Sequence, residues 1–340
     1  MKFPEVKFAP LFVPLNRRME TLVATIWIMT ILFSGITGCT ILWYVLIATR
    51  LWWLGLLYIL WIIFDNIGSS DKKRFTFIRD LSLWHYLRRY FPVSLVKTHD
   101  LSADKSYLFA TFPHGVICPG VFCNFSTNAS PFARLFPSLS PYVITLAFAF
   151  NIPLHREIAV GLGFRGASEK SLINILDKKK GNVAVLIVGG VDEALNSFPG
   201  PVHIVVNRRK GFVRVALKTG ASLVPVFSFG ENYVYDKEEL SPNSLAVRLS
   251  KFINWKEIKY MPKGRGMFQY SFGITPRRHP ITTVVGKPID VPKIQNPTTD
   301  DIEKYHKIFV DDLVKLFEEH KTKYMENAEN INIVLDEIRS

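Results

Sequence analysis

The sequence is poor in cysteine and lacks several short motifs that identify common enzyme classes. Its three cysteines, Cys39, Cys118 and Cys123, are odd in number and form no C-x-x-C pair, which argues against a disulfide framework and against a zinc site. No G-x-S-x-G or H-E-x-x-H is present, which argues against a serine hydrolase and a zinc protease. The pair Gly189-Gly190 does not begin a G-x-G-x-x-G, so it does not indicate a dinucleotide site.

Acidic residues are outnumbered, because 42 Lys and Arg oppose 29 Asp and Glu and give a formal net charge of +13. Such a balance suits nucleic acid, anionic lipid or a phosphorylated small molecule. The sequence has no zinc-finger spacing, no aromatic platform for single strands and no basic region followed by heptads. We therefore expect no nucleic acid among the partners and keep lipid and phosphorylated ligands.

Charge is almost absent from one long stretch, residues 21–64, in which Arg50 is the only charged residue. This stretch is about twice the roughly 20 apolar residues that cross a bilayer, and it is too long for a signal peptide. We expect two transmembrane helices, 21–42 and 46–64, that turn near Arg50 and form a hairpin.

Basic residues flank this stretch on both sides, which by the positive-inside rule places both ends in the cytosol. We therefore expect a cytosolic N-terminal segment (1–20), the membrane hairpin (21–66) and a cytosolic domain (67–340). An alternative is that the short second helix dips into one leaflet, which also leaves 67–340 cytosolic. The flanking residues are Lys2, Lys7, Arg17 and Arg18 on one side, and Lys72, Lys73, Arg74, Arg79, Arg88 and Arg89 on the other.

Beyond residue 67, short β-rich runs alternate with helical patterns, which indicates an α/β fold: a mixed sheet with flanking helices. Residues 168–181 predict a helix with a serine N-cap and a glycine stop, and 211–220 predict a shorter helix. Residues 299–324 predict an amphipathic helix, because their apolar residues fall on one helical face, acidic residues lie at the start and basic residues lie at the end. The runs that predict strands are 106–112, 182–190, 202–206, 222–230 and 281–286.

Phe112-Pro113-His114-Gly115 follows the first of these strands. Proline and glycine turn the chain, so we expect His114 at the carboxyl end of the strand, where α/β proteins place active sites. A neutral imidazole there can take a proton from a hydroxyl, because its pKa lies near neutral pH. The alternative is a structural histidine, and His114 alone does not decide between them.

A second candidate site is the basic run from Asn207 to Arg214, in which Arg208, Arg209, Lys210 and Arg214 surround a glycine ahead of a short helix. Arginine and lysine side chains and helix N-terminal amides bind phosphate oxygens, so the run predicts a phosphate site. The alternative is a solvated basic loop.

Carboxylates follow two other predicted strands. Glu193 comes after the strand 182–190, and Glu231 and Asn232 come after the strand 222–230. Carboxyl ends of strands can meet at one edge of a sheet, so these side chains are candidates for the same site as His114. Glu193 would there orient the imidazole or bind a substrate hydroxyl, and both roles stay open.

Taken in order, these motifs resemble those of the type-two diacylglycerol acyltransferase family, which includes monoacylglycerol and wax-alcohol acyltransferases. The resemblance extends from about Val6 to Tyr324, and within the family it is strongest to the 2-acylglycerol O-acyltransferases. The long basic block is its most specific part. The matching segments are RYFPVSLVKT, FPHG, FCNFSTNAS, IVGGVDEAL, NRRKGFVRVALKTGASLVPVFSFGEN, GRGMFQYSFG and PITTVVGKPI.

The resemblance implies an integral enzyme of the endoplasmic reticulum, also found at lipid droplets, that moves a fatty acyl group from acyl-CoA to an acylglycerol or long-chain alcohol. It makes His114 the general base and Glu193 a second catalytic residue. The resemblance implies no metal and no cofactor, because the thioester of the co-substrate acyl-CoA is already activated. We also expect that the chain can form a homo-oligomer. The predicted substrate-binding residues are Phe112, Pro113, Gly115, Arg208, Arg209, Lys210, Arg214, Glu231 and Asn232.

Phe112 departs from the family pattern, which is His-Pro-His-Gly. Three hypotheses stay open. The first is an enzyme that acylates 2-monoacylglycerol to diacylglycerol for triacylglycerol synthesis. The second is the same chemistry on diacylglycerol or a wax alcohol. The third is a catalytically weak lipid-binding relative in which Phe112 replaces a required histidine.

Overall fold

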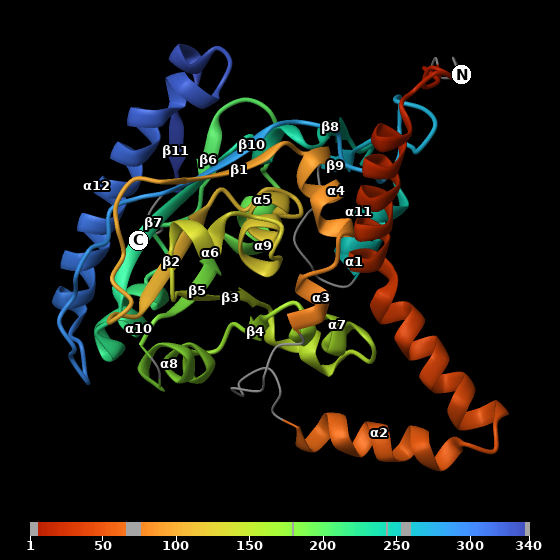
Figure 1. The fold of residues 1–340 in the computed structure, drawn as a ribbon, viewed down its shortest axis with the longest axis horizontal. Coiled ribbons are helices and arrows are strands. Elements are labelled where there is room, and N and C mark those ends of the chain that lie inside the picture. Colours follow the sequence, from red (N-terminus) through yellow and green to blue (C-terminus); the bar gives the residue numbers. More distant parts are fainter. Residues whose placement is uncertain (1–5, 66–75, 179, 243, 253–259, 337–340) are drawn as a thin grey trace.

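The fold was analysed in a computed structural model that describes residues 6–65, 76–178, 180–242, 244–252 and 260–336. A seven-stranded sheet runs through its centre, and helices cover both faces (Figure 1). The strands of this sheet are β1 (Val93–Lys97), β2 (Tyr107–Phe112), β3 (Ser140–Thr145), β4 (Phe164–Gly166), β5 (Asn182–Ile187), β7 (Ser222–Phe229) and β10 (Ile281–Val285).

The order of the strands is β1-β10-β7-β2-β5-β3-β4. From β7 to β4 all neighbours are parallel, whereas β10 is antiparallel to β7 and parallel to β1. The expected mixed sheet with flanking helices is therefore confirmed. The central strands β2 and β7 are buried along their whole length, which explains why most of their side chains are apolar on both faces of the sheet.

Four of the predicted strands correspond to β2, β5, β7 and β10 of the central sheet. The fifth, predicted at 202–206, lies outside this sheet. It forms β6 (Val202–Ile204), which pairs with β11 (Ile333–Leu335) in a separate two-stranded sheet. Strands β1, β3 and β4 were not predicted, because they are short or carry proline or charge.

Three helices cover one face of the sheet: α8 (Glu169–Lys178), α10 (Gly211–Thr219) and α12 (Thr299–Tyr324). All three match the predicted helices. The remaining elements are α3 (Thr76–Arg79), α4 (Leu83–Tyr90), α5 (Pro119–Val121), η2 (Phe122–Ser126), α6 (Phe132–Leu135), η3 (Ala147–Asn151), α7 (His155–Gly161), α9 (Gly190–Ala194), η4 (Glu231–Tyr233), β8 (Asp236–Glu239), α11 (Leu245–Phe252), β9 (Tyr260–Lys263) and η5 (Ala328–Asn330).

The apolar stretch forms α1 (Leu15–Ala48) and α2 (Trp52–Phe64), which differ from the predicted helices 21–42 and 46–64. The turn lies close to Arg50, as expected. Residues 43–48 contain neither proline nor glycine, so the first helix continues through them up to the turn.

The structure does not show the antiparallel hairpin that we predicted. In Figure 1, α2 leaves the end of α1 at a wide angle and runs beneath the domain. Among the described helices, α1 alone is long and apolar enough to cross a membrane. With 13 residues, α2 is about 20 Å long, less than the roughly 30 Å of a bilayer core. The predicted boundary at 66–67 and the basic residues Lys72–Arg74 lie outside the described residues.

The first half of α1 packs against α4 and the domain, with Val23, Ala24 and Trp27 in a core cluster that includes Trp84 and Phe122. This contact places α1 on the face of the sheet opposite to α12, and it encloses the space into which the loop after β2 projects.

Candidate functional site

His114 lies two residues after the last residue of β2, at the carboxyl end of the strand, as the sequence predicts. It lines an apolar cavity of about 480 Å³. The walls come from α1, α3, α4, α7, the segment 114–122 that follows β2, and residues of β3, β4 and β5. Representative wall residues are Val23, Trp27, Trp84, Phe122, Ile158 and Leu162.

The surroundings of His114 favour a neutral imidazole. Its Nδ1 atom is 2.8 Å from the carbonyl oxygen of Gly115, and because a carbonyl only accepts, Nδ1 carries the hydrogen. Nε2 then keeps a free electron pair. Burial lowers the pKa of His114 below its usual value, so the ring is unprotonated at neutral pH. This is the state that a general base requires.

Cys118 supports the same loop without becoming reactive. Its Sγ atom donates to the carbonyl oxygen of His114 at 2.6 Å. Burial raises the pKa of the Cys118 thiol well above its usual value, so the sulfur stays protonated. The thiol is thus one of the contacts that hold the loop of His114 in place.

Glu193, on α9, contacts the backbone of His114 and not its imidazole. One carboxylate oxygen accepts a hydrogen bond from the backbone N–H of His114, and the other accepts from the N–H of Val205 at 2.9 Å. The side chain is fully buried, and burial raises its pKa to about 7. A Cβ atom on Gly189 would lie 2.1 Å from Glu193 Oε2, so this position of the carboxylate requires glycine there.

Glu231 contacts α5, the short helix in which the same loop ends. Its Oε1 atom accepts from the backbone N–H of Gly120 at 2.8 Å, and burial raises the pKa of this carboxyl group to about 8. A Cβ on Gly120 would lie only 2.5 Å from Oε1. Asn232 follows in the same short helical turn; it is buried, and its Oδ1 atom has no hydrogen-bond partner among the described residues.

Phe112, which was predicted to bind substrate, points away from the cavity, toward the face of the sheet that α12 covers. It is completely buried, packs 6.3 Å from the ring of Phe309 on α12, and does not line the cavity. Side chains alternate along a strand, and Phe112 follows Leu108 and Ala110 into the core beneath α12. Of the other two loop residues named from the sequence, Pro113 joins β2 to the loop, and Gly115 adopts a φ of +62°.

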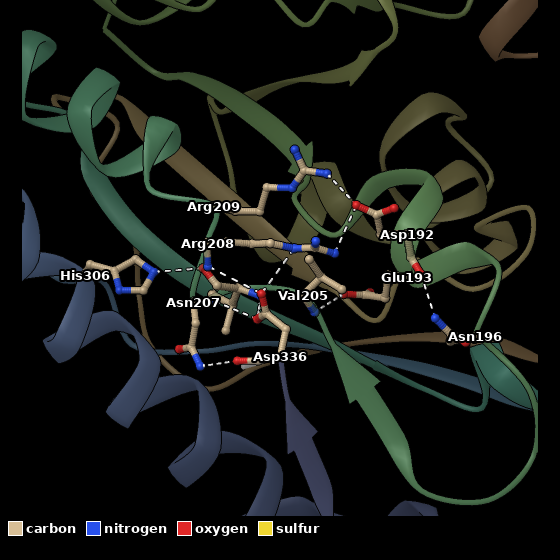
Figure 2. A network of polar contacts seen from close by, with 10 residues as sticks. Asp192, Glu193, Asn196, Val205, Asn207, Arg208, Arg209, His306 and Asp336 are labelled. Carbon is tan, nitrogen blue, oxygen red and sulfur yellow. Dashed lines mark hydrogen bonds and ion pairs between the residues drawn. The ribbon is translucent and has the colours of Figure 1, made fainter. Parts of the chain in front are cut away.

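The basic run forms a network with carboxylates, shown in Figure 2. Arg208 contacts Asp192 at 3.0 Å and Asp336 at 3.3 Å, and Arg209 contacts Asp192 at 3.2 Å. Asp336 also accepts from the backbone N–H of Asn207 at 2.8 Å. The sequence predicts a phosphate site here, with a solvated basic loop as the alternative; in the structure both guanidinium groups are paired with carboxylates.

The other two cations of the basic run, Lys210 and Arg214, differ in whether they are paired with a carboxylate. Lys210 forms an ion pair with Glu303, whereas Arg214 on α10 is exposed and has no ion pair with any residue that the structure describes. Because Asp192 and Glu193 are adjacent on α9, this short helix joins the basic network to the loop of His114. The structure therefore brings the two predicted sites together.

Sequence reasoning missed Asp192 and Asp336 as partners of the basic run, and it missed a second histidine in the cavity, His155. No pattern could have found the last two, because Asp336 is 128 residues from Arg208 and His155 is 121 residues from Ser34, its hydrogen-bond partner.

The letters G-x-G-x-x-G do occur at residues 161–166. They lead from the end of α7 into β4, whereas a nucleotide fingerprint leads from a strand into a helix. The segment therefore does not form a dinucleotide loop. Within the described part of the chain, no group of three or more His, Cys, Asp or Glu side chains is arranged to hold a metal ion.

Comparison with known proteins identifies a family model and several relatives whose names all describe acylglycerol acyltransferases. The model of one family, described as diacylglycerol acyltransferase, matches residues 44–335. A diacylglycerol O-acyltransferase 2 from Dictyostelium discoideum is 41% identical over 322 residues, covering 93% of this chain and 96% of its own. A 2-acylglycerol O-acyltransferase 1 from Bos taurus is 40% identical over 328 residues, covering 94% and 96%. A human diacylglycerol O-acyltransferase 2 is 39% identical over 315 residues, covering 91% and 81%.

Proposed function

Because this chain belongs to the diacylglycerol acyltransferase family and is an acylglycerol O-acyltransferase, we propose that it transfers a fatty acyl group from acyl-CoA to 2-monoacylglycerol. The product is diacylglycerol for triacylglycerol synthesis. One observation carries the proposal: His114, whose Nδ1 atom lies 2.8 Å from the carbonyl oxygen of Gly115 and whose Nε2 atom is thereby left to accept a proton, lines an apolar cavity. Such a cavity suits acyl chains, and such a base suits a single hydroxyl among them.

The reaction follows from that placement. Nε2 of His114 takes the proton of a glycerol hydroxyl while the oxygen attacks the thioester carbonyl of acyl-CoA. The carbon–oxygen bond forms, the carbon–sulfur bond breaks, and the proton passes from the imidazole to the CoA sulfur. General-base assistance of this kind contributes about 100- to 10,000-fold. A thioester is activated already, so the step needs no metal and no redox cofactor.

Glu193 and Glu231 act as positioning residues. Each accepts a hydrogen bond from a backbone N–H of the loop, one at His114 and one at Gly120. Both carboxyl groups are buried, so water does not compete for these contacts. Holding the loop at two points keeps the imidazole where the hydroxyl arrives, which is the main requirement of a reaction between two bound substrates.

The phosphates of acyl-CoA bind at the basic run. Arg214 is exposed and unpaired among the described residues, and Arg208 and Arg209 have side chains that are 41% and 45% exposed. Phosphate oxygens can share or replace Asp192 on these guanidinium groups, since arginine binds carboxylate and phosphate in the same way. Lys210, paired with Glu303, contributes charge nearby.

The membrane holds the enzyme at its substrates. The exposed apolar side chains of α1 and α2 suit lipid, and because α2 is too short to cross a bilayer, both helices enter the membrane from the cytosolic side and return to it without crossing. The endoplasmic reticulum, with both chain ends in the cytosol, is the location that we propose; lipid droplets are a second one.

The test uses membranes that contain the full chain, labelled oleoyl-CoA, and 2-oleoylglycerol, 1,2-dioleoylglycerol or hexadecanol as separate acceptors. We expect robust acylation of 2-oleoylglycerol and its loss in His114→Ala, with the exposed His203→Ala as a matched control. Near-normal activity of His114→Ala would contradict the proposal. Preference for dioleoylglycerol or hexadecanol would keep the chemistry and change the acceptor.

A further inference from the structure

A second histidine lines the cavity, in a wall that is otherwise almost entirely apolar. His155, at the start of α7, lies with its Nδ1 atom 2.8 Å from the hydroxyl oxygen of Ser34 on α1. Both residues line the same cavity as His114. Ser34 is buried and His155 is half-buried, so the pair is a polar feature of the cavity and not of the outer surface.

The close packing of two segments brings this pair together. A Cβ atom on Gly38 would lie 2.1 Å from the carbonyl oxygen of Pro153, and one on Gly35 would lie 2.9 Å from a methyl carbon of Ile152. The glycines of α1 thus allow the chain before α7 to approach the helix backbone. This approach places His155 against Ser34, one turn before Gly38 on the same face of the helix.

His155 has one ring nitrogen left for a ligand. Nδ1 is occupied by Ser34, and Nε2 has no hydrogen bond to any residue in the described part of the chain. Burial lowers the pKa of His155, so the ring is neutral at neutral pH, and Nε2 is a donor or an acceptor according to the tautomer. The hydroxyl of Thr30, also in the wall, already donates to the carbonyl oxygen of Ile26.

We propose that His155, oriented by Ser34, binds the second free hydroxyl of 2-monoacylglycerol and so sets the acceptor specificity of the enzyme. This inference rests on the proposed function. 2-Monoacylglycerol has two primary hydroxyls: one reacts at His114, and the other must be accommodated in an apolar cavity. Diacylglycerol has that second position esterified and a long-chain alcohol lacks it. A site built to hydrogen-bond a hydroxyl discriminates against acceptors without one.

The experiment measures kcat/KM for 2-oleoylglycerol, 1,2-dioleoylglycerol and hexadecanol in membranes containing the full chain. For His155→Leu we expect a loss of about tenfold with 2-oleoylglycerol, mainly in KM, which is the effect of one hydrogen bond to a neutral group. The values for the other two acceptors stay at the wild-type level. His155→Gln restores part of the loss, Ser34→Ala produces a smaller loss in the same direction, and the exposed His203→Leu changes nothing.

An equal loss with all three acceptors would overturn the inference, because it would show that His155 only supports the fold. Unchanged kinetics of both His155→Leu and Ser34→Ala with 2-oleoylglycerol would overturn it as well. If the wild-type chain acylates none of the acceptors, the proposed function itself fails. The wild-type arm and the variant arms therefore separate the two failures.

Discussion

Replacement of Glu193 by glutamine tests whether the loop of His114 must be held by a carboxylate. The two oxygens of Glu193 accept from two backbone N–H groups, those of His114 and Val205. Glutamine offers one oxygen, and its NH₂ group would face the second N–H. One buried donor therefore loses its acceptor, which costs about 1–3 kcal/mol of folding free energy. If the donor is that of His114, the imidazole moves, and a displacement of about 1 Å costs roughly 100-fold in rate.

We therefore expect kcat of Glu193→Gln to fall by about 10- to 100-fold, while KM for acyl-CoA stays unchanged because the basic run is not altered. The assay is acylation of 2-oleoylglycerol with labelled oleoyl-CoA, combined with thermal unfolding to show that the variant is folded. Glu169→Gln is the matched control, because Glu169 is exposed and pairs with Lys218 far from the loop. Wild-type kcat in Glu193→Gln would refute a positioning role for this carboxylate.

Three further outcomes are expected. Burial lowers the pKa of His114 below 6.5, the ordinary value for histidine. We therefore expect kcat/KM to fall on acidification only below pH 6.5. A fall that begins above pH 6.5 would contradict a buried neutral base. Phe112→His should not increase acylation and should lower the unfolding temperature, because it places an imidazole in the core against Phe309; a gain in activity would contradict that placement. The folded-state pKa of Glu231, about 8, lies above its ordinary value of 4.5, so the native state holds this proton more tightly and stability should decrease as the pH rises between these values. Glu231→Gln should remove that part of the pH dependence in thermal unfolding scans, and an unchanged dependence would show that Glu231 is not its source.

In the apolar segment, the sequence predicted the extent of the segment and its turn but not the angle between α1 and α2. The lack of charge between residues 21 and 64 was enough to identify the apolar stretch and the turn near Arg50. It could not show the angle between α1 and α2, because that angle depends on the contacts of α1 with α4 and of α2 with α7. One such contact is the hydrogen bond from Tyr58 to Glu157, 99 residues away.

Elements whose pattern is local could be predicted from the amino-acid sequence alone. Apolar runs identified four strands of the central sheet, and periodicity with terminal charges identified α12. The strand before Pro113-His114-Gly115 was enough to place His114 at a strand end, because the residues involved are neighbours in the chain.

The contacts that these residues make could not be predicted, because they depend on how distant segments pack. Glu193 is 79 residues from His114, and nothing in either segment shows that the carboxylate binds the backbone N–H and not the imidazole. The direction of Phe112, the pairing of Arg208 with Asp336 and the contact of Ser34 with His155 are equally non-local. Hydrophobic periodicity determines which face of a strand or helix is buried, but the partners on that face are chosen by how the elements pack, and packing is a property of the whole chain.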